Sequence, residues 1–279
     1  MGRVYWNRVA LNSAIQSLQS CLCVGLDTDL SKLPAHLVER EDSMLEFNKS
    51  IIDHTLPFTV AYKINSAFYE KLGLPGMKVL EETVRYVLLK NKFVILDAKR
   101  GDIGNTGEMY AKAAFEYLDA DAITVSPYMG KDSIDPFLKF SGHWTILLAL
   151  TSNPGAENFQ LKKLDSGSFL YEEIILQAKQ WGNRDQLMFV TGATQSKYLA
   201  RIRSIVPDYF LLIPGVGAQG GDLEEVMEHT LTTAGDILIN SSRSILYASN
   251  GTDFGEAAGK EAENIQTKMA EYIVKKRQL

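Results

Sequence analysis

The sequence predicts an α/β protein, a single (β/α)8 TIM barrel with an extra N-terminal helix, from three observations. Short apolar runs recur eight times in 279 residues, and they are continuous, as in strands covered on both faces of a parallel sheet. Segments with the polar stripe of amphipathic helices separate the runs. No linker or change in composition divides the chain, so residues 1–279 are expected to form one barrel domain.

The eight apolar runs are predicted to be the barrel strands in chain order. They cover residues 22–27, 58–64, 93–99, 122–127, 145–151, 187–193, 209–216 and 236–242. Helices are expected between them, for example at 76–91, 106–118 and 170–182, and the tail 272–279 is expected to be a solvated helix end. Residues 1–20 are predicted to add a helix that closes the bottom of the barrel. A doubly wound open sheet would show the same alternation, but the strand count favours the barrel.

Composition and charge exclude several classes of protein. The chain is 46% hydrophobic and 23% charged, and its net charge of -5 argues against a general nucleic-acid or membrane-surface binder. The N-terminus lacks the apolar core of a signal peptide, and no run approaches the length of a membrane span. Cys21 and Cys23 lie in an apolar stretch and are poorly placed to bridge each other, so we expect a reduced, cytoplasmic protein.

The predicted strands end in polar residues. In a (β/α)8 barrel the C-terminal strand ends meet at one mouth, where catalysis takes place, so side chains far apart in sequence converge there. These residues are Asp27, Lys63, Asn65, Asp97, Lys99, Ser152 and Arg243. Any one of them alone is explained by the chain meeting solvent, but their convergence favours a site.

The segment 96–106, LDAKRGDIGNT, holds the densest group of charges at a strand end. Asp97 and Lys99 are two residues apart, so on a strand both side chains project to the same side, and Lys63 from the neighbouring strand could join them. Such an array keeps each charge paired while presenting both signs to a substrate. A structural ion-pair network is an equally good interpretation of this motif alone. Asp102 is expected in the following loop, where it could serve a neighbouring subunit.

The segment 211–222, LLIPGVGAQGGD, is rich in glycine. Gly215, Gly217 and Gly220 have the GxGxxG spacing of dinucleotide-binding folds, but the segment follows the seventh predicted strand rather than the first, which weakens that interpretation. Glycines at this place in a barrel let backbone N–H groups approach a phosphate, and Arg243 would add a positive charge. A phosphorylated small molecule is the expected ligand.

The four histidines are scattered without metal-ligand spacing, and no GxSxG or Cys–His arrangement occurs, so no metal site is expected. No histidine lies at a predicted strand end. Lys99 and the aspartates are therefore the natural groups for proton transfer.

The segment 96–106 resembles the D-x-K-x-x-D signature of the orotidine 5'-phosphate decarboxylase family and is similar to its longer bacterial branch. Matching segments at other predicted strand ends are CVGLD, AYKIN, TSNPGA, PGVGAQGGD and SSRSI. The resemblance implies decarboxylation of orotidine 5'-monophosphate to UMP and carbon dioxide, the last step of de novo UMP biosynthesis, without a metal or organic cofactor. It also implies a homodimer with the active site at the subunit interface.

The resemblance further implies a role for each matching residue. Lys99 would donate a proton to C6 of the pyrimidine, Asp97 would lie beside the departing carboxylate, and Lys63 and Asp102 would complete the charge array. The substrate-binding residues would be Asp27 for a ribose hydroxyl, Ser152 for the pyrimidine edge, Gln219 and Arg243 for the phosphate, and Thr106, which with Asp102 would reach the partner's site. The segment 157–168 is a long connection whose role neither the pattern nor the resemblance assigns; a lid over the site is one interpretation.

Two rival functions remain. Related barrels that share D-x-K-x-x-D carry out metal-assisted enolate chemistry on sugar phosphates, but they have a glutamate at the end of strand two, where this chain has Lys63. A nucleotide-binding regulator without catalytic activity would keep the phosphate site and lose a charge from the array. All four charges are present, which favours an enzyme.

Overall fold

The computed structural model describes residues 5–38, 40, 42–216 and 221–278, which form a closed eight-stranded barrel. All neighbouring strands are parallel, and the order follows the chain from β1 to β8, with β8 paired to β1. The strands are β1 (Leu22–Gly25), β2 (Ala61–Asn65), β3 (Phe93–Arg100), β4 (Ala122–Val125), β5 (Trp144–Leu150), β6 (Leu187–Thr191), β7 (Phe210–Pro214) and β8 (Ile237–Ser241). The predicted TIM barrel is confirmed, and the open doubly wound sheet is excluded.

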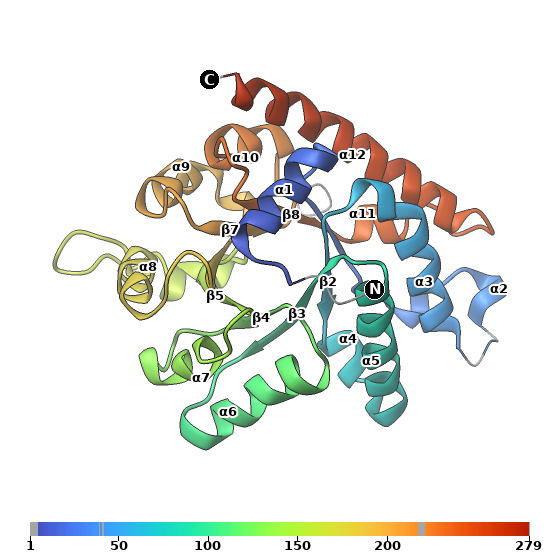
Figure 1. Cartoon of the computed structure of the whole chain (residues 1–279), viewed down its shortest axis with the longest axis horizontal. Helices are drawn as coiled ribbons and strands as arrows, with labels where there is room; N and C mark the ends of the chain where they lie inside the picture. The colour runs from blue at the N-terminus through green and yellow to red at the C-terminus, as the bar shows by residue number, and fades with distance from the viewer. Residues whose placement is uncertain (1–4, 39, 41, 217–220, 279) are drawn as a thin grey trace.

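Helices surround the barrel on its outer face (Figure 1). The longer ones are α1 (Arg8–Leu18), α3 (Ser43–Thr55), α5 (Gly73–Leu89), α6 (Gly104–Lys112), α8 (Leu170–Trp181), α9 (Ser196–Ile205), α10 (Leu223–Thr230) and α12 (Phe254–Arg277). Four-residue helices are α2 (Ala35–Val38), α4 (Ala67–Glu70), α7 (Asp135–Leu138) and α11 (Arg243–Leu246). The strands are buried throughout most of their length, because the helices cover one face and the barrel interior the other.

Some predicted boundaries are wrong. The strand predicted at 58–64 begins later, at Ala61, because Leu56–Phe58 forms a 3-10 turn around Pro57. The helix predicted at 106–118 is divided into α6 and a π-helical turn, Ala113–Tyr117. The periodicity of the sequence does not distinguish a 3-10 turn from an adjacent strand, or a π-helical turn from an adjacent α-helix.

Helix α1 closes the N-terminal end of the barrel, as expected, and Figure 1 shows it lying across that end in front of β8. The Trp144 indole N–H, at the start of β5, donates to the Trp6 carbonyl at 2.6 Å. Asp236, just before β8, accepts from Arg8 Nη2 at 2.8 Å and from Asn12 Nδ2 at 2.9 Å. These contacts seal the bottom, so the only open end of the barrel in the described structure is the C-terminal one.

Candidate active site

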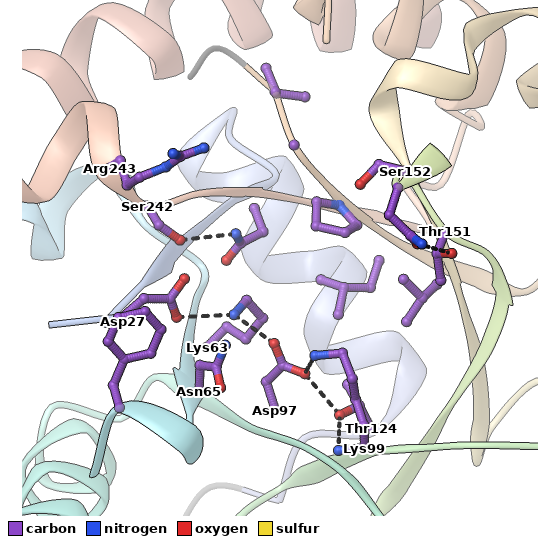
Figure 2. Close-up of a pocket in the computed structure, with 18 of the residues that line it drawn as sticks. Asp27, Lys63, Asn65, Asp97, Lys99, Thr124, Thr151, Ser152, Ser242 and Arg243 are labelled. Carbon is purple, nitrogen blue, oxygen red and sulfur yellow. Dashed lines mark hydrogen bonds and ion pairs between the residues drawn. The ribbon is translucent and has the colours of Figure 1, made fainter. Parts of the chain in front are cut away.

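The C-terminal strand ends surround a cavity of about 600 Å³. All eight strands, or the residues that follow them, contribute to its lining. Figure 2 shows the charged residues on the side of β1 to β3, Arg243 and Ser242 at β8, and Thr151 and Ser152 after β5. A cavity of this size, with a partly apolar wall and convergent polar groups, is typical of a small-molecule site.

Four charged side chains form a continuous chain across one wall of the cavity (Figure 2). Lys63 Nζ lies 3.2 Å from Asp27 Oδ1 and 2.8 Å from Asp97 Oδ2. Asp97 uses its other oxygen, Oδ1, to accept from Lys99 Nζ at 2.6 Å. The predicted association of Lys63, Asp97 and Lys99 is therefore present, and Asp27 extends it.

Burial and neighbouring charges have opposing effects on the pKa values of Lys63 and Asp97. Burial alone would lower the pKa of Lys63, but the charges of Asp97 and Asp27 outweigh it and raise the pKa above its ordinary value. Burial would likewise raise the pKa of Asp97, yet Lys63 and Lys99 hold it far below its usual range. The side chain of Lys63 is 5% exposed, whereas that of Lys99 is 50% exposed toward the mouth. Lys63 and Asp97 are thus both charged at neutral pH, and Lys99 is the lysine of the array that a ligand can reach.

The backbone at Lys99 is irregular. Lys99 has a φ of 47°, in the left-handed region that non-glycine residues rarely adopt, and the β3–β4 register shifts between Leu96 and Arg100. Thr124 of β4 supports this conformation, because its Oγ1 accepts from Lys99 N at 3.0 Å and donates to Asp97 Oδ1 at 3.0 Å. The expected contact between Asp97 and Lys99 exists, but a bulge rather than a regular strand creates it.

One of the two predicted phosphate-binding residues, Arg243, is placed at the cavity by the structure. Arg243 follows β8 and lines the cavity together with Gly215, which follows β7. Gln219, Gly217 and Gly220 lie outside the described residues. Lys32 also lines the cavity, and its ammonium lies 5.3 Å from the centroid of the Tyr247 ring. This side of the cavity is suited to an anion.

Ser152 lines the cavity from the end of β5. A Cβ on Gly192 would lie 2.7 Å from Ser152 N, so only glycine permits this approach of β6 to the serine. The preceding residue, Thr151, donates its backbone N–H to Gln160 Oε1 at 2.7 Å. Gln160 belongs to the segment 157–168, so part of that connection buttresses the end of β5.

Asp102 and Thr106 do not line the cavity of their own chain. Asp102 lies between β3 and α6, as expected, and its Oδ1 accepts from the backbone N–H of Ile103 at 2.8 Å. Thr106 is exposed on the first turn of α6. Six of the nine predicted site residues line the cavity, Gln219 lies outside the described residues, and Asp102 and Thr106 are absent from the lining.

Sequence reasoning missed several residues that line the cavity: Thr124, Asn153, Asn240, Ser242 and Tyr247. Asn240 interrupts the apolar run ILINS, and that polar residue within a buried strand was a usable signal. Thr124 gave no comparable signal, because threonine is common in strands.

Among the residues that the structure describes, no three or more His, Cys, Asp or Glu side chains are arranged to hold a metal ion. No described helix combines the length and apolar character needed to cross a membrane. Although α12 has 24 residues, its sequence contains many charges.

The fold and the cavity define a TIM barrel whose open end carries an array of paired lysine and aspartate side chains. Residues 20–258 match the family "Orotidine 5'-phosphate decarboxylase / HUMPS family". A Flavobacterium johnsoniae protein named orotidine 5'-phosphate decarboxylase is 53% identical over 94% of this chain and 97% of its own. This chain therefore belongs to the orotidine 5'-phosphate decarboxylase / HUMPS family.

Solved structures agree with this assignment. The structure of a Leishmania donovani OMP decarboxylase has a TM-score of 0.77 and 32% identity, covering 94% of this chain and 99% of that one. An orotidine 5'-monophosphate decarboxylase from Methanocaldococcus jannaschii, complexed with the inhibitor BMP, has a TM-score of 0.63 and 25% identity. It covers 87% of this chain and 96% of its own.

Proposed function

We propose that this enzyme decarboxylates orotidine 5'-monophosphate to UMP and carbon dioxide, the last step of de novo UMP biosynthesis, without a metal or organic cofactor. The observation that carries the proposal is the Lys63–Asp97–Lys99 array, with contacts of 2.8 and 2.6 Å, at one wall of a nucleotide-sized cavity. The relatives named above support the substrate.

The reaction needs a stabilised carbanion and a proton. When the bond between C6 and the carboxylate breaks, its electron pair stays on C6 in an sp2 orbital that the ring cannot delocalise. In the proposal, the Lys99 ammonium stabilises this charge and then gives C6 a proton, after which the neutral amine regains one from solvent. The half-exposed position of Lys99 at the cavity mouth suits both steps.

Lys99 is insufficient alone. One ion pair at 4 Å and an effective dielectric of 20 contributes about 4 kcal/mol, whereas large enzymatic accelerations require roughly 20 kcal/mol. Binding energy from the phosphate and ribose would supply much of the remainder by organising the site around the transition state. A phosphate-free substrate analogue should therefore lose kcat as well as affinity; a loss of affinity alone in steady-state kinetics would contradict this account.

Asp97 has a second proposed role beside the departing carboxylate. Because Lys63 and Lys99 hold its pKa low, Asp97 remains an anion and would repel the substrate carboxylate until carbon dioxide leaves. The binding roles in the proposal are Asp27 for a ribose hydroxyl, Ser152 for the pyrimidine edge, and Arg243 and Gln219 for the phosphate.

We also propose a homodimer in which Asp102 and Thr106 enter the partner's cavity. Neither residue lines the cavity of its own chain, and the surface around them exposes apolar side chains that a partner would cover. These side chains are Ile103, Tyr110, Tyr128 and Met129. The two free, buried cysteines support a cytoplasmic location, where thiols stay reduced.

Complementation tests the shared site. Lys99→Ala and Asp102→Ala should each be inactive, but subunits exchanged between them should recover about a quarter of wild-type activity, because half the dimers are mixed and each mixed dimer has one intact site. Turnover after mixing and refolding measures this recovery. No recovery, with mixed dimers demonstrated by differential tagging, would place Asp102 in its own subunit's site or in none.

Enolate chemistry on a sugar phosphate is the second candidate within the same family. In this chain the end of β2 carries Lys63, whose ammonium is already held between Asp27 and Asp97. The test is loss of orotidine 5'-monophosphate absorbance in EDTA. We expect full turnover there; no turnover, with activity on a sugar phosphate restored by magnesium, would favour the second candidate.

A further inference from the structure

Asn240 is a polar residue within the buried part of β8. It is 6% exposed and lines the cavity. Its Nδ2 donates to Ser242 Oγ at 3.2 Å, while its carbonyl oxygen, Oδ1, is buried and has no hydrogen-bond partner among the described residues. A buried acceptor without a hydrogen-bond partner is destabilising, so it points to a partner that arrives with a ligand.

The neighbouring strand leaves room for this amide. A Cβ on Gly25 of β1 would lie 1.9 Å from Ser242 Oγ and 3.0 Å from Asn240 Oδ1. Glycine at position 25 therefore lets the Asn240–Ser242 pair occupy the space over β1. The hydrogen bond from Asn240 Nδ2 to Ser242 Oγ orients the amide, and the lack of a side chain at Gly25 leaves space beside its oxygen.

A carbonyl oxygen can only accept a hydrogen bond, so its partner on the ligand must be a donor. The phosphate, the carboxylate and the pyrimidine oxygens of orotidine 5'-monophosphate are acceptors, so they cannot bond to it. The donors are the two ribose hydroxyls and the N3–H group. Ser152, proposed for the pyrimidine edge, follows β5, which lies across the barrel from β8 and β1.

The ribose is the group that fits. Asn240 pairs in register with Cys23 of β1, so it lies beside the strand that leads to Asp27. Arg243 follows Asn240 by three residues and lies just after β8, at the start of α11. We propose that Asn240 Oδ1 accepts a hydrogen bond from a ribose hydroxyl and fixes the sugar between Asp27 and Arg243. This inference rests on the proposed function, since it takes the ligand to be a nucleotide.

Calorimetric titration of UMP, 2'-deoxy-UMP and 3'-deoxy-UMP into the wild type and two variants tests the inference. In the wild type each missing hydroxyl should weaken binding about tenfold, which equals about 1.4 kcal/mol. In Asn240→Leu, which removes the acceptor at similar volume, the penalty for one of the two analogues should fall below about twofold. Asn240→Asp keeps an acceptor, so it should retain both penalties even if all three ligands bind more weakly.

Unchanged penalties for both analogues in Asn240→Leu would overturn the inference while leaving the proposed function intact. Failure of UMP to bind the wild type would instead overturn the proposed function and this inference with it. Thermal melting checks that each variant is folded. If leucine prevents folding, Asn240→Ala removes the same acceptor with a smaller side chain. The affinity of UMP relative to each of the two deoxy analogues then tests the inference in the same way.

Discussion

Two charged clusters lie at opposite ends of the barrel, and they use similar groups for different purposes. The lower cluster consists of Arg8, Asn12, Thr232 and Asp236, and the upper cluster of Asp27, Lys63, Asp97 and Lys99. In the lower cluster Asp236 is sealed under α1 and satisfied from several sides. In the upper cluster Lys99 is half exposed and faces a cavity. The two clusters thus differ in whether a charged group remains available to a ligand.

The backbone shows the same contrast. Asp236 and Lys99 both have left-handed φ angles, of 51° and 47°. Aspartate adopts this conformation several-fold more often than most residues, so it fits the lower cluster easily. Lysine has no such preference, and holding it there costs about 1–3 kcal/mol. The strain at Lys99 is consistent with a position selected for chemistry rather than stability.

Lys99 should give the largest effect. Lys99→Ala is expected to lower kcat about 10⁴-fold, because it removes both the stabilising charge and the proposed proton donor. Lys99→Gly should be equally inactive yet should gain about 1 kcal/mol of unfolding free energy over Lys99→Ala, because glycine accepts a positive φ. Steady-state kinetics and urea denaturation measure the two quantities.

Lys78→Ala is the matched control for that pair, since the Lys78 side chain is 78% exposed and does not line the cavity. It should leave both kcat and stability nearly unchanged. If Lys99→Ala retained more than about a tenth of wild-type kcat, the distinction between the two clusters would be lost.

Asp236→Ala should have the reverse effect. It leaves Arg8 without its buried partner, so the free energy of unfolding should fall by about 3–5 kcal/mol. Turnover per folded molecule should stay within about twofold of the wild type, because the lower cluster lies outside the cavity. A large loss of kcat in fully folded protein would mean that the two ends are coupled.

The pH dependence of the free energy of unfolding tests the lowered pKa of Asp97. Its folded pKa lies below its unfolded value of about 3.9, so its stabilising contribution is present above pH 4 and disappears as the pH falls through the folded pKa. Lys63 behaves in the opposite sense, because its raised pKa gives a contribution present below about pH 10 and lost at higher pH. The stability difference between wild type and Asp97→Asn should therefore be constant from about pH 5 to 9 and shrink below about pH 4. Urea denaturation of both proteins across these pH values measures the difference. A stability difference that grows in acid would contradict the lowered pKa of Asp97.

Gln160 should give the smallest effect. Gln160→Leu removes the acceptor for the Thr151 N–H beside Ser152, and we expect about a tenfold weaker binding of UMP. Gln160→Glu keeps that acceptor and should restore affinity. Binding of ribose 5-phosphate, which has no pyrimidine, should not change in either variant, and equal weakening of both ligands would indicate general destabilisation instead.

The sequence predicted the barrel because continuous apolar runs and amphipathic segments are local features that survive folding. It also predicted the contact of Lys63, Asp97 and Lys99, since strand ends in a barrel must converge. It did not predict the bulge that turns Lys99 into a left-handed conformation, because that bulge depends on Thr124 of a neighbouring strand. Asn240 was missed although its polar side chain interrupts an apolar run; only the lack of a partner for its oxygen depends on the fold, because it requires β8 to lie beside Gly25.

The most direct test of the central claim is exchange of the C6 hydrogen of UMP with solvent deuterium, followed by NMR with the wild type, Lys99→Ala and Asp236→Ala. If Lys99 donates the proton to C6, it must also remove it from bound product, so the wild type should catalyse exchange. Asp236→Ala should do so at a similar rate, and Lys99→Ala should show none above the uncatalysed background at saturating UMP. Exchange at the wild-type rate in Lys99→Ala would show that another group carries the proton and would contradict the account.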